Sequence, residues 1–494
     1  MSKQKVIIIG GGLGGLVCAA ILAKEGLDVT VVEKNPRVGG CLQSYRRDNA
    51  IFDTGMHIFG GMHEGGNIRK IFDYLGVTDM LNIRNLDEAS DIEIFIDKEK
   101  TTHTFALNRG QFIESVSKIF PKEKINLQNY LKKMDGVMDQ MDLFHLRTDK
   151  GLNSAGNVDF NLAANKFISK YIGDNRLAAM LGILNVFYAG EINLTPAFLH
   201  SSISSIFLNG ACRIAGGYET LANALTFVIK RYGGKISVNS KVVKINTVNK
   251  EVVSVLTDNG DLIHGDSFIL ASPTNELESL LDNPGLLSNA YRSFISVRKD
   301  SISSFIVNFR LRKNTIEYSN RIGFFLKDYD KTWKDESGSD IGRFMYMTPP
   351  VVNQGKFAET LNVVAPMKWS VVEQWEKSIK DTRDREYYLF KDSLVESIIG
   401  KLSEIYTNLR DAIEYIDSAT PLTIRDFTGV RHGAMCGLRK DCDDAIPFIP
   451  LRTKIPNLLL TGQSINMHGF CGVTLTAVQT CEEILGRDYL INKF

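Results

Sequence analysis

The fold of this chain is decided by the stretch KVIIIGGGLGGLVCAAILAKEGLDVTVVE, residues 5–33 of 494. Its first five residues form an apolar run, which predicts a strand buried on both faces of a parallel sheet. Small and aliphatic residues recur at helical spacing over 15–25, and VTVVE at 29–33 is a second apolar run. The stretch therefore predicts a β-α-β unit whose first turn is rich in glycine.

The glycines of that turn satisfy the pattern G-x-G-x-x-G through Gly10, Gly12 and Gly15. In this pattern the glycines allow a tight turn, a close approach of the backbone to a pyrophosphate, and close packing of the helix on the strand. The N-terminus of the following helix offers unpaired N–H groups and a positive dipole end to phosphates. We expect Leu13 and Gly14, in the same turn, to lie at the pyrophosphate as well.

Glu33 lies 23 positions after Gly10, at the end of the second predicted strand. Its carboxylate can accept hydrogen bonds from an adenosine ribose and would repel a ribose 2′-phosphate, so it favours an ADP-ribose moiety without that phosphate. The next residue, Lys34, is either a positive charge near the phosphates or a solvated side chain. These features predict a dinucleotide site without separating FAD from NAD.

Further glycine-rich segments favour FAD. A glycine pair follows the acid at 39–40, FDTGMH at 52–57 is another expected approach of backbone to cofactor, and HGFCGVT at 468–474 opens a helix. The N-terminal N–H groups of that helix can bind the flavin pyrimidine, which gains negative charge on reduction. Several such sites around one extended cofactor suit FAD better than NAD. The residues expected there are Gly39, Gly40, Gly55, Met56, His57, Gly462, Gln463, Gly472, Val473 and Thr474.

Composition excludes several classes of protein. The 58 basic and 57 acidic residues give a net charge of +1, which argues against a nucleic-acid partner. None of the seven cysteines forms a CxxC pair, so we expect neither a disulfide framework nor a metal site. The chain enters a strand at once, which leaves no room for a signal peptide, and the uncharged stretch 192–212 is too polar to span a membrane. We expect a cytoplasmic protein.

The order of strand-like and helical patterns predicts an α/β protein with two interleaved domains. A Rossmann-type FAD-binding domain is expected from three segments, 1–95, 205–290 and 416–494. An inserted α+β substrate domain is expected from 96–204, which is mostly helical in pattern, and from 291–415.

The sequence resembles the FAD-dependent phytoene desaturase, carotenoid isomerase and retinol saturase family over nearly its whole length. The likeness is weakest at about 80–200 and 290–410. Two details resemble the retinol saturase branch: Cys41 stands where many relatives have Arg, and His57 follows Gly55 by two positions. The motifs that carry the resemblance are residues 6–40, RIAGGYETLANAL (213–225), SVNSKVVKI (237–245), ATPLTIRDFTGVRHGAMCGL (419–438) and NLLLTGQSINMHGFCGVTLTAVQTCEEIL (457–485).

The resemblance implies an amine oxidase/phytoene desaturase-like fold and an FAD enzyme that acts on carbon–carbon double bonds of a hydrophobic polyene or related lipid. It implies that Glu33 binds the adenosine ribose, Gly40 the middle of the cofactor, and Val242 the adenine side through its backbone. It also implies that Gly462 and residues 472–474 lie along the pyrophosphate and isoalloxazine. Saturation is slightly favoured over desaturation and isomerisation.

The flavin can carry this chemistry, so the protein needs chiefly to position the substrate and manage one proton. His57 and His468 lie in the expected flavin motifs and could exchange that proton, or could simply hydrogen-bond backbone. His432 is a weaker candidate, and Cys471 is expected to be packing. Residues 177–208 could line a hydrophobic tunnel, although helix core is the more common role of such a pattern.

No second G-x-G-x-x-G follows a strand, so electrons would pass to or from a quinone, oxygen, a separate reductase or transiently bound NAD(P)H. A polyene substrate makes peripheral membrane contact reasonable, but no basic amphipathic helix supports it. Two other functions remain open: a flavin amine oxidase, and a lipid carrier resembling Rab GDP-dissociation inhibitors. The charge run at 381–385 is expected to be a solvated helix start. The oligomeric state is not predicted.

Overall fold

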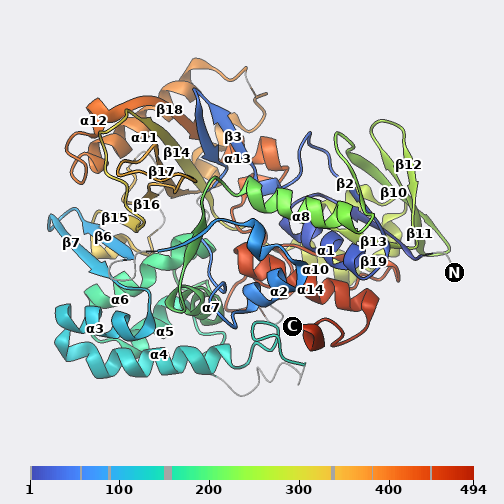
Figure 1. Ribbon diagram of the computed structural model, residues 1–494, viewed down its shortest axis with the longest axis horizontal. Coiled ribbons are helices and arrows are strands. Elements are labelled where there is room, and N and C mark those ends of the chain that lie inside the picture. The colour runs from blue at the N-terminus through green and yellow to red at the C-terminus, as the bar shows by residue number, and fades with distance from the viewer. Residues whose placement is uncertain are drawn as a thin grey trace.

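The computed structural model describes residues 3–55, 58–86, 91–148, 158–334, 340–380, 382–444 and 448–494 (Figure 1). A five-stranded parallel sheet, in the order β19-β13-β1-β2-β9, forms the part of the molecule on the right of Figure 1. Its strands come from three distant parts of the chain. They are β1 (Lys5–Ile9), β2 (Asp28–Val32), β9 (Lys235–Ser237), β13 (Ser267–Leu270) and β19 (Leu458–Leu460).

Both faces of this sheet are covered, which explains the unbroken apolar run of β1. Val6 and Ile8 pack into the core on the helical side, while Ile7 and Ile9 pack toward an antiparallel sheet on the other side. The covering elements are α1 (Leu13–Lys24), α8 (Glu219–Arg231) and α14 (Gly469–Leu485) on one face, and β10 (Val242–Val248), β11 (Glu251–Thr257) and β12 (Leu262–His264) on the other. The predicted β-α-β unit is confirmed, and an Asn-Gly turn at 259–260 joins β11 to β12.

A second, seven-stranded mixed sheet has the order β18-β14-β17-β16-β15-β6-β7. The helix α11 (Arg385–Leu402) packs on one face, and the other face joins the main core beside the helical group at the lower left of Figure 1. The strands are β6 (Ile92–Ile96), β7 (Thr101–Phe105), β14 (Ser303–Leu311), β15 (Ile322–Leu326), β16 (Arg343–Met347), β17 (Thr360–Met367) and β18 (Ile413–Ala419).

The helical group supports the open face of that sheet. Its members are α3 (Arg109–Ile119), α4 (Lys124–Met138), α5 (Ala164–Tyr171), α6 (Asn175–Gly182), a 3-10 turn (Ile183–Tyr188) and α7 (Ala197–Leu208). The remaining elements are the hairpin β3 (Ser44–Arg47) and β4 (Ala50–Asp53), the pair β5 (Ile83–Asn85) and β8 (Cys212–Ile214), and the helices α2 (Asn67–Leu75), α9 (Leu277–Leu280), α10 (Asn289–Ser296), α12 (Leu409–Ala412) and α13 (Pro421–Thr428). Among the helices of the described residues, none combines the length and apolar character that a membrane crossing needs.

The division into five segments stays a proposal. Two of its boundaries, at 95/96 and 415/416, fall inside β6 and β18. Both strands belong to the seven-stranded sheet, so we propose that the substrate-side segments begin before β6 and end after β18.

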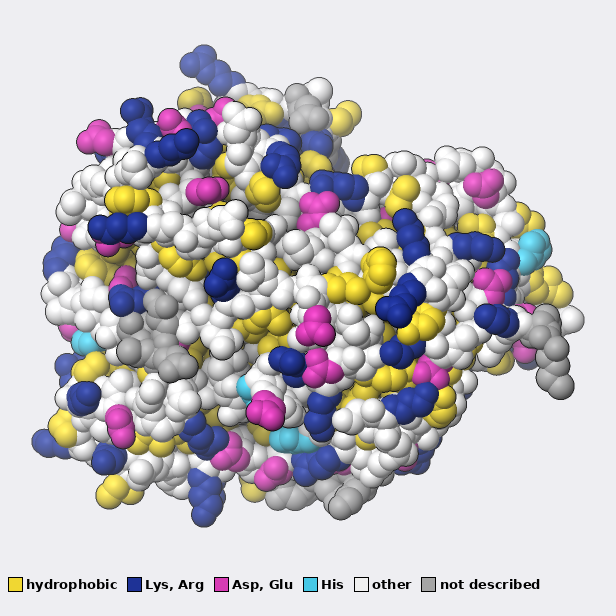
Figure 2. Space-filling model, viewed as in Figure 1, with side chains coloured by type: hydrophobic (Ala, Val, Ile, Leu, Met, Phe, Trp, Pro, Cys, Tyr) yellow, Lys and Arg dark blue, Asp and Glu magenta, His cyan; other side chains and the backbone are white. Residues whose placement is uncertain are grey.

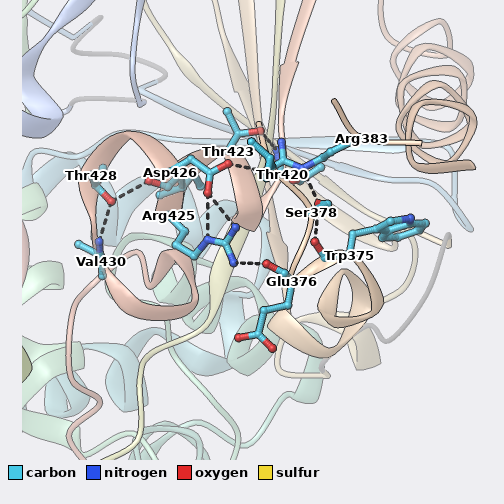
Figure 3. A network of polar contacts seen from close by, with 12 residues as sticks. Trp375, Glu376, Ser378, Arg383, Thr420, Thr423, Arg425, Asp426, Thr428 and Val430 are labelled. Atoms are coloured by element: carbon cyan, nitrogen blue, oxygen red, sulfur yellow. Dashed lines mark hydrogen bonds and ion pairs between the residues drawn. The ribbon is translucent and has the colours of Figure 1, made fainter. Parts of the chain in front are cut away.

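The charge run at 381–385 is the start of α11, as expected, and Asp384 and Arg385 are exposed, but the Arg383 side chain is buried. The Asp384 side chain caps α11 by accepting from the Tyr387 backbone N–H at 2.8 Å. The Arg383 side chain is only 5% exposed and pairs with Asp426 on α13, which also pairs with Arg425 (Figure 3). Asp381 lies outside the described residues. The burial of Arg383 could not be predicted from the local sequence, because its partner Asp426 lies 43 positions further along the chain.

Candidate active site

The glycine-rich turn joins β1 to α1. The Gly10 N–H donates to the carbonyl of Val32 at 2.9 Å, and the φ of Gly10 is +107°, which favours glycine. A Cβ on Gly15 would lie 2.0 Å from the Gly10 oxygen, so only glycine lets α1 pack this closely on the strand end. These two contacts fit the roles that the fingerprint assigns to its first and last glycine.

The second glycine pair lies against the first turn. The Gly39 N–H donates to the carbonyl of Gly11 at 2.7 Å, and a Cβ on Gly40 would lie 3.2 Å from the Cα of Gly12. The backbone after β2 therefore returns to the glycine-rich turn, as an extended cofactor lying over both would require.

The C-terminal glycine motif reaches the same place. A Cβ on Gly14 would lie 3.3 Å from Val473 Cγ1 and 3.6 Å from the Cα of Gly462. Gly472 packs on Met467, where a Cβ would lie 2.5 Å away. The buried Thr474 hydroxyl donates to the Phe470 carbonyl at 2.9 Å, so its side chain is engaged within α14.

The buried Glu33 carboxylate is oriented by two backbone donors. Its Oε2 accepts from the Gly11 N–H at 2.7 Å and its Oε1 from the Asn35 N–H at 2.8 Å. The Glu33 carbonyl accepts from the Ser240 N–H at 2.9 Å, which brings the start of β10, and with it Val242, alongside the acid. We propose that this is the adenine side of the site, as the resemblance implies.

Other predicted residues lie around these segments. The Lys34 Nζ donates to the Thr428 carbonyl at 3.0 Å, so its charge is directed at α13. The exposed Cys41 accepts at its carbonyl from the Thr54 hydroxyl at 2.8 Å, and Gly55 follows in the chain. Met56 and His57 lie outside the described residues.

The residues present fit FAD. A Cβ on Gly12 or on Gly462 would meet no atom within 4 Å, so open space lies over both glycines. α1 and α14 lie side by side with their N-terminal ends together, and neither Gly12 nor His468 supplies a side-chain cap. Both helices therefore present unpaired N–H groups and positive dipole ends to one region. Gly10 to Gly15, Glu33, Gly39 and Gly40 would hold the ADP half, and Gly462 with Gly472 to Thr474 the flavin half.

His468 is buried and neutral. Its Nδ1 lies 3.2 Å from the Gln463 carbonyl, which can only accept, so Nδ1 carries the proton and Nε2 the lone pair. Burial lowers the pKa of His468 to about 3, and the charge of Lys440 acts in the same direction. The ring can accept a hydrogen bond at Nε2 but has no proton to give there.

The other reactive candidates from sequence lie in structural contacts. The His432 Nδ1 pairs with Asp300 at 2.8 Å, and its ring lies 4.9 Å from that of Trp369. Burial raises the pKa of Cys471 to about 12, and its sulfur lies 3.7 Å from the Asn67 amide nitrogen. A protonated, buried thiol of this kind is packing, as expected.

Two cavities adjoin α7. One lies at the N-terminal end of α14. Its lining residues are Tyr188, Leu199, Ser202, Ile203, Ile206, Met467, His468 and Gly472. The other, of about 30 Å³, is lined largely by apolar side chains from β6, α3, α4, α6 and α7. Segment 177–208 supplies residues to both, so it lines apolar space and is also helix core.

Lys440 is a site residue that sequence analysis missed. It is 2% exposed, and its Nζ donates to the carbonyls of Ser464 at 3.2 Å and Ile465 at 3.1 Å, in the loop that carries Gln463. Its sequence context, RKDCDD at 439–444, is typical of an exposed turn, so no local signal marks the burial.

Lys440 is expected to make the protein more stable as the pH rises from about 7 to 10. Burial, with the Arg298 charge nearby, lowers the pKa of Lys440 from its ordinary 10.5 to about 7. Between these values the unfolded chain holds one more proton than the folded chain. The free energy of unfolding therefore rises with pH, by at most about 1.4 kcal/mol per unit. Urea unfolding of the wild type and Lys440→Met across this range measures the difference, and parallel pH dependences would contradict the expectation.

The fold and the converging glycine segments define an FAD-binding oxidoreductase of Rossmann type. The model of the family described as flavin containing amine oxidoreductase matches residues 13–485, and the chain belongs to this family. The expected fold class, FAD as cofactor, and enzymatic oxidoreductase activity are thereby confirmed, which leaves the carrier alternative without support.

Relatives and solved structures agree with this assignment. The chain is 26% identical to an all-trans-retinol 13,14-reductase of Danio rerio, over 97% of this chain and 85% of the relative. It is 24% identical to a 4,4'-diaponeurosporene oxygenase of Staphylococcus haemolyticus, over 98% and 97%. Its fold matches that of an oxidoreductase from Methanosarcina mazei with a TM-score of 0.66 at 16% identity, over 97% and 100%. The retinol saturase-like resemblance is confirmed.

Proposed function

We propose that this protein acts on carbon–carbon double bonds of a hydrophobic polyene, retinoid-like or isoprenoid, with saturation as the favoured direction. The observation that carries the proposal is a cavity of about 10 Å³, with a largely apolar lining, at the N-terminus of α14, where the flavin half of the cofactor is expected. Its apolar side chains must move apart to admit a polyene. Bound FAD would supply hydride transfer and store the electron pair. Relatives named for retinol and diaponeurosporene chemistry support a polyene as the substrate class.

The protein's own part is to bind the apolar chain, exclude water and manage a proton. Leu199, Ile203, Ile206 and Met467 offer the cavity only apolar contact, so binding rests on burial of hydrophobic surface. We propose a quinone or transiently bound NAD(P)H as the electron partner, because the chain has no second dinucleotide fingerprint.

We also propose peripheral contact with a membrane, from which such a substrate would be drawn. Ile379 is 74% exposed and Phe427 is 53% exposed. The ammonium of Lys380, the residue after Ile379, lies 4.0 Å from the centre of the Phe427 ring. Exposed apolar side chains beside a lysine suit an anionic bilayer surface. Figure 2 shows acidic and basic side chains interspersed over the visible face, so contact would rest on this local patch. Co-sedimentation with anionic vesicles tests it.

The test of the reaction uses the FAD-loaded enzyme, reduced without oxygen and mixed with all-trans-retinol or a longer polyene. Saturation is expected to reoxidise the flavin and shorten the conjugated system, which moves the polyene absorbance to shorter wavelength. Desaturation would need the oxidised enzyme and move it to longer wavelength, while isomerisation would leave the flavin state unchanged. No reaction with any polyene, together with hydrogen peroxide release from amines, would overturn the proposal in favour of an amine oxidase.

A further inference from the structure

Three buried polar groups form a chain through the apolar core. His200, in α7, lies between Tyr130 of α4 and Tyr188 at the end of the 3-10 turn before α7. The Tyr130 hydroxyl is 2.5 Å from His200 Nε2, and the Tyr188 hydroxyl is 2.9 Å from His200 Nδ1. His200 is fully buried and each tyrosine is 2% exposed. A polar chain of this kind costs stability unless every member is hydrogen-bonded, and here all three are.

All three groups are uncharged at neutral pH. Burial lowers the pKa of His200 to about 3 and raises the pKa of Tyr130 and of Tyr188 above the ordinary range. A neutral imidazole donates at one nitrogen and accepts at the other. One tyrosine must therefore donate a hydrogen bond to His200 while the other accepts one from it. Two arrangements are possible: the hydrogen bonds run either from Tyr130 to Tyr188 or from Tyr188 to Tyr130.

The hydrogen-bonded series Tyr130–His200–Tyr188 connects the two cavities beside α7. Tyr188 lines the one that contains His468 and Gly472, and Tyr130 lines the one of about 30 Å³. Ser204 lines the latter too, and its buried hydroxyl has no hydrogen-bond partner among the described residues. That volume is large enough for one or two water molecules, for which the Tyr130 and Ser204 hydroxyls are suitable partners.

We infer that Tyr188 donates the proton that completes saturation of the double bond. His200 and Tyr130 position the Tyr188 hydroxyl and return a proton to it. The inference rests on the proposed function: hydride addition to one alkene carbon leaves the other carbon in need of a proton. The Tyr188 O–H bond breaks as the new C–H bond forms. The His200 Nδ1 proton then passes to the Tyr188 oxygen, and the Tyr130 proton passes to Nε2. Water in the second cavity returns one proton to Tyr130, and the hydroxide left there takes a proton from bulk solvent. Solvent therefore supplies the net proton, and His200 stays neutral overall.

The surroundings favour Tyr188 over His468 as the donor. Both line the same cavity, but the His468 proton is on Nδ1, at the Gln463 carbonyl. Arg343, buried and bonded to Asn185 at 2.9 Å, lowers the pKa of Tyr188 against the effect of burial and so stabilises a transient phenolate. Gly190 leaves room for the ring, since a Cβ there would lie 2.5 Å from Tyr188 Cε2.

The hydrogen-bond order is tested by nitrogen-15 spectra of histidine-labelled holoenzyme, which need no substrate. The protein has eight histidines, and the His200→Gln variant identifies the signals of His200 by their absence. Tyr188→Phe removes the partner of Nδ1, so His200 is expected to carry its proton on Nε2, facing Tyr130. Tyr130→Phe is expected to move that proton to Nδ1. The relay would be overturned if the His200 proton stayed on the same nitrogen in both variants, or if the His200 ring titrated between about pH 5 and 9.

The donor role is tested by the rate at which a polyene reoxidises the reduced enzyme. Tyr188→Phe is expected to slow this step by about 10²- to 10⁴-fold, the usual worth of a general acid, with FAD content and polyene affinity unchanged. Tyr130→Phe is expected to slow it less. Tyr346→Phe is the control, because Tyr346 is also buried and hydrogen-bonded, to Glu93 at 2.7 Å, but lines neither cavity.

The outcomes separate this inference from the proposed function. A Tyr188→Phe enzyme that binds polyene and reacts at the wild-type rate overturns the donor role alone. A wild-type enzyme that no polyene reoxidises overturns the proposed function and the donor role together, and the spectra then decide the relay on their own. Loss of FAD or of folding in Tyr188→Phe, without loss in Tyr130→Phe, would show a structural role and contradict the inference.

Discussion

Gly12→Ala is expected to weaken FAD binding by about 5- to 150-fold while leaving the stability of the apoprotein unchanged. The backbone of Gly12, with φ −74° and ψ −179°, suits alanine, and the new Cβ would meet no protein atom within 4 Å. The methyl group therefore costs the fold nothing, but it enters the space over the glycine-rich turn that the pyrophosphate is expected to fill. Overpacking by one such group costs about 1–3 kcal/mol, which gives this loss of affinity. Titration of apoprotein with FAD, beside urea unfolding, measures both quantities.

Two other glycines provide the controls. Gly15→Ala places a Cβ 2.0 Å from the Gly10 oxygen and is expected to destabilise the apoprotein itself. Gly136→Ala, where a Cβ in the last turn of α4 meets nothing within 4 Å, is expected to lower neither the FAD affinity nor the stability of the apoprotein. Wild-type FAD affinity in Gly12→Ala would mean that the cofactor does not lie over this turn.

Asp426→Ala is expected to lower the free energy of unfolding by about 3–5 kcal/mol. The Asp426 side chain is 15% exposed and that of Arg383 5%, so removal of the carboxylate leaves a guanidinium buried without its counter-charge. Arg425 also loses its partner, although it keeps a bond to the Glu376 carbonyl at 2.8 Å (Figure 3). The network holds α13 to the segment that enters α11, so its loss loosens the packing beside the seven-stranded sheet.

An exposed ion pair provides the comparison for that variant. Arg410 and Glu396 are about 60% exposed and lie 3.0 Å apart, so Glu396→Ala is expected to cost less than about 1 kcal/mol. Urea midpoints at unchanged slope measure both changes. Equal, small effects from the two substitutions would contradict the importance of burial here.

The cofactor site was predictable from sequence because its signals are local. The strand-glycine-helix order, the spacing to Glu33 and the glycine pairs are each contained in a few neighbouring residues. Which strands belong to the seven-stranded sheet was harder to predict from the sequence. β6 and β18 fall across expected domain boundaries, since no local pattern says which of two sheets a strand will join.

The Tyr130–His200–Tyr188 chain could not be predicted in this way. Its members come from three elements and meet only through packing, with 70 positions between Tyr130 and His200. One weak signal existed: a single histidine inside the apolar helix AFLHSSISSIFL at 197–208. A histidine there must find partners, but the sequence does not say which ones.

The order of strands in the parallel sheet also constrains how the protein is made. β1 pairs with β13, which in turn pairs with β19, so the sheet is complete only after the ribosome has synthesised residues 458–460. α14, where the flavin half of the cofactor is expected, follows β19 directly in the sequence. Until β19 pairs with it, β13 presents an unpaired strand edge, which is the kind of edge that can pair with another chain.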